Sequence, residues 1–136
     1  MIVLYGDHYG ISNNHKKAMA KLTNITGFHD YDNAMYQRVP FMIHMPGLKG
    51  GINHTYGGEI DALPTILNLL GIKDNDTVQF GSDLLSANHP QTVAFRNGDF
   101  VTPDFTKVGS QYFNTSTGKK ITKLSPSQKK TVDAAT

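Results

Sequence analysis

The apolar run at residues 1–5, Met-Ile-Val-Leu-Tyr, contains no polar position. A half-exposed strand alternates apolar and polar residues, whereas a strand covered on both faces is apolar throughout. The run therefore predicts a strand that is buried on both faces and ends at Gly6. Residues 39–45, Val-Pro-Phe-Met-Ile-His-Met, predict a second strand, which Pro46 and Gly47 end.

The segment after the first strand predicts one helix and one loop. Residues 12–22 are polar with a helix-like Lys-Lys-Ala-Met-Ala-Lys-Leu stretch, and Asn13 or Asn14 is the expected N-cap. The following residues, to about position 37, are rich in Asn, Thr, Asp and Gly. That composition predicts a loop.

The strongest helix signal lies in the middle of the chain. Asp61 is the expected N-cap, Pro64 falls in the first turn, where its missing N–H costs little, and Gly71 is the expected stop. The apolar positions between 66 and 70 give this helix its buried face. Residues 91–113 alternate aromatic and β-branched residues with Gly, Pro and Asn, which predicts a small antiparallel sheet.

The basic residues are concentrated at the C-terminal end. The chain of 136 residues has a formal net charge of +2, but residues 119–136 contain five lysines and one aspartate, so the remainder has 8 basic and 10 acidic residues. A nucleic-acid-binding protein concentrates basic residues on its folded surface with aromatics between them, so nucleic acid is not an expected partner. Residues 116–136 are predicted to be a polar, basic, flexible tail. No apolar run reaches the ~20 residues that span a bilayer, so no membrane segment is expected within the chain.

The candidate metal ligands are Asp7 and His8, which follow the first strand between Gly6 and Gly10. Neighbouring side chains on a strand point to opposite faces, so both can reach one ion only where the strand has ended and the backbone turns. A carboxylate with a neutral imidazole suits manganese or zinc. From this pair alone, a turn aspartate beside a surface histidine remains the more common interpretation. The chain contains no cysteine, which excludes thiolate metal sites.

Several other polar residues are interpreted as structural. His54 is expected in a solvated loop and His44 on a strand face. Glu59 and Asp61 are expected to begin a helix instead of forming an acid–base pair. Arg96 and Asp99 flank Asn97-Gly98, a strong hairpin-turn signal, and are expected to contact each other or nearby loops.

Four segments in order resemble motifs of the alkaline phosphatase and sulfatase superfamily. They are the Asp-His-Tyr-Gly motif at residues 7–10, the Val-Pro strand with its Pro-Gly stop at 38–47, the Asp-Ala-Leu-Pro-Thr helix at 59–72, and Phe-Gly-Ser-Asp-Leu-Leu at 80–85. Within the superfamily, the continuation Ile-Ser at 11–12, the Gly-Gly pair at 50–51 and Phe-Arg-Asn-Gly-Asp-Phe at 95–100 are similar to lipoteichoic acid synthases.

The resemblance implies an α/β fold: the C-terminal portion of an alkaline phosphatase/sulfatase-like sheet with flanking helices, plus a small antiparallel β subdomain. It covers residues 1–115. It implies a phosphoglycerol transferase that moves glycerophosphate from phosphatidylglycerol to growing lipoteichoic acid, with one Mn²⁺ ion. Asp7 and His8 match family metal ligands, and Ser12 matches a serine that contacts the glycerophosphate head group.

The threonine nucleophile and a glutamate ligand lie upstream in the family, so the resemblance implies no catalytic nucleophile in this chain. The expected partner is the N-terminal part of the same protein, and the expected location is the extracellular face of the bacterial membrane. Two alternatives remain open. One is a sulfatase or phosphoethanolamine transferase of the same superfamily, and the other is a non-catalytic cell-surface module.

Overall fold

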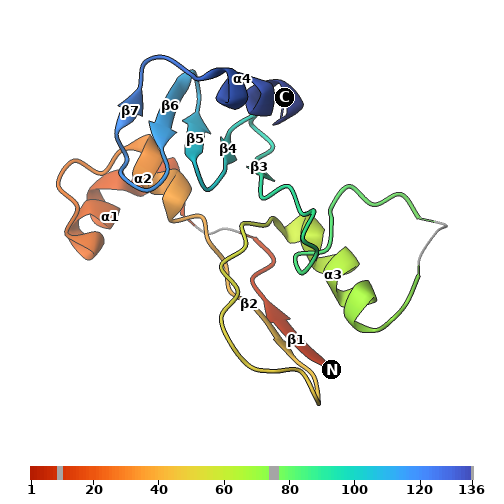
Figure 1. Cartoon of the computed structure of the whole chain (residues 1–136). Helices are drawn as coiled ribbons and strands as arrows, with labels where there is room; N and C mark the ends of the chain where they lie inside the picture. Colours follow the sequence, from red (N-terminus) through yellow and green to blue (C-terminus); the bar gives the residue numbers. More distant parts are fainter. Residues whose placement is uncertain (9–10, 74–76, 136) are drawn as a thin grey trace. The chain divides into compact units, whose positions relative to one another are not determined.

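A computed structural model describes residues 1–8, 11–73 and 77–135 of the chain (Figure 1). The chain divides into two compact units, Met1–Asn53 and His54–Thr136. The first unit contains β1 (Ile2–Tyr5), a 3₁₀ turn η1 (Asn13–His15), α1 (Lys16–Thr23), α2 (Asp30–Met35) and β2 (Phe41–His44). The second contains η2 (Glu59–Asp61), α3 (Ala62–Leu69), β3 (Val93–Ala94), β4 (Phe100–Val101), β5 (Phe105–Val108), β6 (Gln111–Asn114), β7 (Lys120–Ile121) and α4 (Pro126–Ala135).

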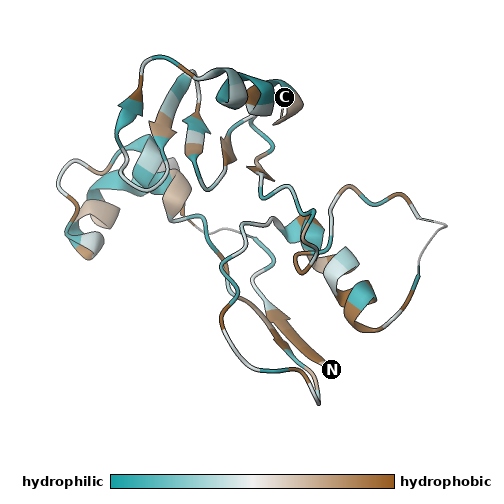
Figure 2. Cartoon of the chain, viewed as in Figure 1, coloured by the Kyte–Doolittle hydropathy of each residue, from teal (hydrophilic) through white to brown (hydrophobic). Residues whose placement is uncertain are grey.

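Strands β1 and β2 form an antiparallel two-stranded ribbon in the first unit. The register pairs Ile2 with His44 and Tyr5 with Phe41, and the rings of the latter pair meet edge to face at 6.4 Å. Both predicted strands are therefore confirmed. The prediction that β1 is buried on both faces is wrong for this chain, because Ile2, Leu4 and Tyr5 are 55–60% exposed. Figure 2 shows that β1 is a hydrophobic strand. Among the described residues of this unit, it pairs with β2 alone.

Helix α1 confirms the helix predicted from residue 12, although its cap differs. The Ser12 hydroxyl accepts a hydrogen bond from the Asn14 N–H at 3.2 Å, so Ser12 is the N-cap of the 3₁₀ turn that precedes α1, whereas Asn13 or Asn14 was the expected cap. The helix ends at Asn24, whose φ of 56° is left-handed. Asparagine tolerates this conformation better than most residues, which explains the stop.

Helix α2 occupies a segment that was predicted to be a loop. The His29 N–H donates to Asp32 Oδ2 at 2.8 Å, as in one half of a capping box, and this bond satisfies a free donor at the helix start. The helix is tied to its surroundings by the Phe28–Tyr36 ring contact at 5.9 Å and by the Lys16–Asp30 ion pair with α1. These tertiary contacts stabilise a sequence of weak helix formers.

Helix α3 confirms the predicted helix and its stop. Gly71 has a φ of +68°, its N–H donates to the Asn68 carbonyl at 3.0 Å, and the Ile72 N–H donates to the Leu67 carbonyl at 2.9 Å. This pair of bonds is the Schellman arrangement, which requires the left-handed residue that glycine provides. The predicted N-cap, Asp61, lies in the 3₁₀ turn directly before the helix.

The second unit is built on a five-stranded antiparallel sheet in the order β3-β4-β5-β6-β7. The predicted small antiparallel sheet is confirmed, and β7 extends it beyond residue 113. Its core contains Phe100 and Phe105, which are 1% and 2% exposed and meet nearly perpendicularly at 5.4 Å. The residues expected to form a polar tail carry β7 and helix α4. Within the described residues, no helix is both long and apolar enough to cross a membrane.

Three buried threonines, Thr102, Thr106 and Thr115, are joined by hydrogen bonds within and next to this sheet. The Thr115 hydroxyl donates to the Thr102 carbonyl at 2.8 Å, and Thr106 lies 2.9 Å away, oxygen to oxygen. Since the single Thr115 proton is used on the carbonyl, Thr106 must donate to Thr115. Thr106 is fully buried, so its hydroxyl is satisfied here by Thr115 and not by solvent.

We predict that Thr115→Val destabilises the chain by about 1–3 kcal/mol, because it leaves the Thr106 hydroxyl and the Thr102 carbonyl buried without this partner. Urea unfolding followed by tyrosine fluorescence measures the effect. The exposed Thr122 provides a matched control, and Thr122→Val should change the free energy of unfolding by less than about 0.5 kcal/mol. Equal stability of the two variants would contradict the assigned role of the three threonines.

Candidate functional site

The candidate metal ligands leave the ribbon where β1 ends. The Gly6 N–H donates to the Pro40 carbonyl at 3.0 Å, so pairing with the segment before β2 continues one residue past the strand. A Cβ on Gly6 would lie 2.8 Å from Val39 Cβ, closer than side-chain carbons approach each other. Glycine is therefore required by close packing here. Asp7 follows at once, at the end of the paired segment.

Asp7 and His8 are next to each other and open to solvent. The Asp7 Oδ1 and His8 Nε2 atoms are 3.8 Å apart, and the side chains are 83% and 77% exposed. Two metal–ligand bonds of about 2.1 Å span up to about 4.2 Å, so the two atoms are close enough to share one ion. The described residues contain no group of three or more His, Cys, Asp or Glu side chains that could hold a metal. The pair fits part of a metal site and does not form a complete one.

The third predicted site residue, Ser12, lies on a loop held by α2 and the residue after its C-cap. The Gln37 side-chain amide donates to the Ile11 carbonyl at 2.9 Å and to Asn33 Oδ1 at 2.7 Å. Asn33 is 7% exposed, so the amide pair is anchored within the unit. The loop carrying Ser12 is therefore fixed by α2, a helix that the sequence did not predict. Tyr9 and Gly10, which complete the predicted motif, lie outside the described residues.

A second polar cluster centres on the carboxylate of Asp61, which is 4% exposed. Its Oδ2 accepts from the Gly58 N–H and its Oδ1 accepts from the Ser82 N–H, both at 2.8 Å. Hydrogen bonds to a carboxylate are stronger than neutral ones, which offsets the cost of burying the charge. Asp61 is thus a structural link between the start of α3 and the 80–85 segment, as expected for a helix-start residue.

The same two segments are joined again one helical turn later. The Leu84 N–H donates to the Thr65 hydroxyl at 2.9 Å, and that hydroxyl donates to the Asp61 carbonyl at 2.6 Å. A Cβ on Gly81 would lie 2.0 Å from the Ile60 carbonyl oxygen, so only glycine permits the approach. The Asp-x-x-x-Thr and Gly-Ser-Asp-Leu-Leu motifs are therefore the two halves of one hydrogen-bonded clamp, which we call the α3 clamp.

His89 completes this cluster and was not identified from the sequence. Its Nε2 lies 2.7 Å from the Tyr56 carbonyl, which only accepts, so Nε2 carries a proton. In the neutral ring, Nδ1 then accepts from the Ser82 hydroxyl at 2.6 Å. The ring is buried, with Nε2 at 3.9 Å from Asp61 Oδ2. Its partners are 7 and 33 residues away, and no local pattern relates them to it.

The remaining predicted polar residues are structural or solvent-exposed. His44 and His54 are exposed. Asp99 accepts from the Gly109 N–H at 2.6 Å and from the Asn97 side chain at 2.7 Å, so its partners are nearby loops. The hairpin turn predicted at Asn97-Gly98 is confirmed, with Gly98 at a φ of +81°.

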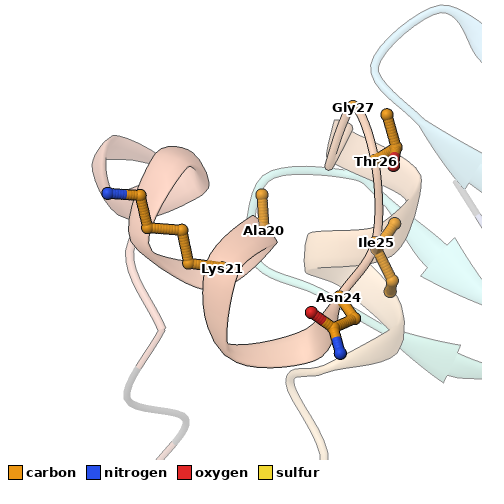
Figure 3. Close-up of a pocket in the computed structure, with 6 residues that line it drawn as sticks. All are labelled: Ala20, Lys21, Asn24, Ile25, Thr26 and Gly27. Atoms are coloured by element: carbon orange, nitrogen blue, oxygen red, sulfur yellow. The ribbon is translucent and has the colours of Figure 1, made fainter.

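The first unit also has a shallow hollow of about 250 Å³ at the C-terminal end of α1. It is lined by Ala20, Lys21, Asn24, Ile25, Thr26 and Gly27 (Figure 3). Figure 3 shows the Lys21 side chain extending away from Ile25 and Thr26, and the lining contains no other ionisable residue. The hollow therefore does not have the converging polar groups of a ligand site.

Comparison with known proteins gives consistent matches. The chain is 55% identical over 123 residues to lipoteichoic acid synthase 1 of Bacillus subtilis and 52% identical over 121 residues to lipoteichoic acid synthase 2 of the same organism. It is 45% identical over 124 residues to lipoteichoic acid synthase of Staphylococcus aureus. No family model matches the chain.

The chain is homologous to the C-terminal part of lipoteichoic acid synthases. The matches cover 89–90% of the chain and 19% of each of these synthases, so it spans about a fifth of their length. The α3 clamp thus belongs to the region that is related to the synthases. Its hydrogen bonds give a physical reason for the residue types in two of the recognised motifs.

We predict that Gly81→Ala opens the α3 clamp, because the new methyl group collides with backbone at Ile60 and not with a flexible side-chain end. The expected loss is about 1–3 kcal/mol or more of unfolding free energy. Hydrogen exchange should show lower protection of the Ser82 and Leu84 amides. The control is Gly51→Ala, since nothing lies within 4 Å of a Cβ at Gly51. Unchanged exchange in the Gly81 variant would contradict the clamp.

Proposed function

We propose that the chain is the C-terminal part of a metal-dependent phosphoglycerol transferase that extends lipoteichoic acid. The observation that carries the proposal is the pair Asp7 and His8, placed at the end of a strand within 3.8 Å of each other in a chain 45–55% identical to lipoteichoic acid synthases. The proposed substrate is phosphatidylglycerol and the acceptor is the growing polymer. The proposed location is the extracellular face of the bacterial membrane.

Asp7 and His8 are suited to be two of the ligands of a manganese ion. Asp7 would supply a carboxylate oxygen and His8 an imidazole nitrogen, both acceptable to Mn²⁺. When bound, Mn²⁺ would neutralise charge on the phosphoryl oxygens and favour the ionised form of a nucleophile. The part of the protein upstream of Asp7 would supply the remaining ligands and the threonine nucleophile.

Ser12 has a separate proposed task. Its hydroxyl accepts from the Asn14 N–H, and accepting this bond does not use the hydroxyl proton. The proton can be donated to an oxygen of the glycerophosphate head group. The bonds from Gln37 to the Ile11 carbonyl would hold the loop in place while this occurs.

The ribbon offers the surface against which the upstream part would pack. Ile2 and Leu4 lie on one face, with Tyr5 on the other, and Met42 of β2 is also 55% exposed. A two-stranded ribbon is marginally stable alone. Further strands and helices of an alkaline phosphatase/sulfatase-like fold would bury these side chains and hold Asp7 and His8 near the other ligands.

We predict that Asp7→Ala or His8→Ala in the full-length protein abolishes polymer synthesis, because each removes one of a small number of metal ligands. Ser12→Ala should lower kcat/KM by roughly tenfold or more, as expected for the loss of one hydrogen bond to a charged group. Radiolabelled glycerophosphate incorporation measures all three. His44→Ala and His54→Ala are matched controls, since both side chains are exposed. Normal synthesis by the Asp7 variant would refute the metal assignment.

We also predict that the 136-residue chain alone does not release diacylglycerol from a fluorescent phosphatidylglycerol analogue, even with Mn²⁺, because covalent catalysis has no first step without its nucleophile. Mixing the chain with a separately produced upstream part should restore Mn²⁺-dependent turnover. The same mixture with Leu4→Lys in β1 should show little recovery, because a charge would enter the packed face. Turnover by the purified chain alone would contradict this division of the site.

A further inference from the structure

Residues 119–136, which we call the basic segment, carry an unusual share of the positive charge. Five lysines and one aspartate fall within it, whereas the rest of the chain has 8 basic and 10 acidic residues. All five lysines are exposed. Neither their charge nor their position is used by the candidate metal pair or by the α3 clamp.

The basic segment contains ordered elements that are attached to the antiparallel sheet. Strand β7 pairs with β6, and Lys120 lies opposite Phe113. Helix α4 begins with reciprocal bonds between Ser125 and Gln128, at 2.9 and 3.2 Å. The Gln128 side chain also donates to Asp104 Oδ2 at 3.0 Å, which ties the helix to the residue before β5. The charges are therefore presented from a folded surface.

The composition of the basic segment restricts the class of partner. It contains no aromatic residue on which a base could stack, which disfavours single-stranded nucleic acid. Val132 is the single large apolar side chain in α4, so the helix has no apolar face to insert into a bilayer. Lysine acts as a point charge toward phosphate and does not require a bidentate geometry. These properties fit a linear phosphodiester without bases.

We propose that the basic segment binds the growing glycerol phosphate polymer through its backbone phosphates. The identity of this polyanion rests on the proposed function. The charge, the exposure and the folding of the segment are observed independently of that function. Such contacts are independent of sequence and weaken with salt, because binding releases counterions from the polymer. The segment would hold the product chain near the enzyme between successive additions.

The test is fluorescence anisotropy with a labelled glycerol phosphate oligomer and the full 136-residue chain. The test variant is Lys119→Gln, Lys123→Gln, Lys129→Gln and Lys130→Gln together, which spares Lys120 within β7. The control replaces four exposed lysines elsewhere by glutamine, namely Lys17, Lys21, Lys49 and Lys73. Each set removes four charges, so both variants change from +2 to −2. A difference in affinity between the two variants therefore results from where the lysines lie in the chain and not from the net charge.

We expect the test variant to bind the oligomer at least about tenfold more weakly at low salt, since each lysine beside an anionic surface contributes about fivefold. The slope of log binding constant against log salt should also fall. The control variant should retain both the affinity and the slope of the parent. Circular dichroism and thermal unfolding would verify that both variants remain folded.

Equal weakening of the two variants would overturn the proposal, because net charge alone would then explain binding. Tighter binding to phosphatidylglycerol vesicles or to an oligonucleotide than to the oligomer would also overturn it. The measurement needs no turnover, so it is separate from the test of the proposed function. An active full-length enzyme whose C-terminal part does not bind the oligomer would refute this inference alone.

Discussion

The carboxylate of Asp61 is a buried charge with two backbone donors from different segments of the second unit. Removing it would leave the Gly58 and Ser82 N–H groups without this partner, and a buried donor that loses its acceptor costs more than an average hydrogen bond gains. The start of α3, the 80–85 segment and the ring of His89 all take their positions around this one group. The motif residues at 61–65 and 80–85 therefore have a structural role, since their hydrogen bonds hold these two segments together.

The regular elements that could be predicted are those with local causes. The Schellman stop at Gly71, the Asn97-Gly98 turn and the apolar strands depend on residues a few positions apart, and a sequence displays such spacing directly. Helix α2 has local contacts too, the His29–Asp32 capping bond and the Phe28–Tyr36 ring pair, but its residues are weak helix formers, so propensity alone favoured a loop. The prediction that β1 is buried failed for a different reason. An apolar pattern indicates that a strand face is to be covered, but it does not identify the segment that covers it.

The candidate site divides in the same way. Asp7, His8 and Ser12 could be selected because they follow a strand and resemble a family motif. The structure places Asp7 Oδ1 and His8 Nε2 at a separation that is compatible with one ion. His89 could not be selected, since its partners Ser82 and Tyr56 come together only in three dimensions. The support of the Ser12 loop by Gln37 was hidden for the same reason, because 26 residues separate the amide from the Ile11 carbonyl.

The close packing of Gly6 against Val39 links the segment that carries Asp7 and His8 to the segment before β2. A larger residue at position 6 would push the two strands apart at the point where Asp7 begins. Related sequences should consequently conserve these two positions as a pair, with any gain in volume at one matched by a loss at the other. In a genetic screen, Val39→Gly would then be a natural second-site suppressor of Gly6→Ala. The position of the proposed metal pair would then depend on the packing of Gly6 against Val39 as well as on Asp7 and His8.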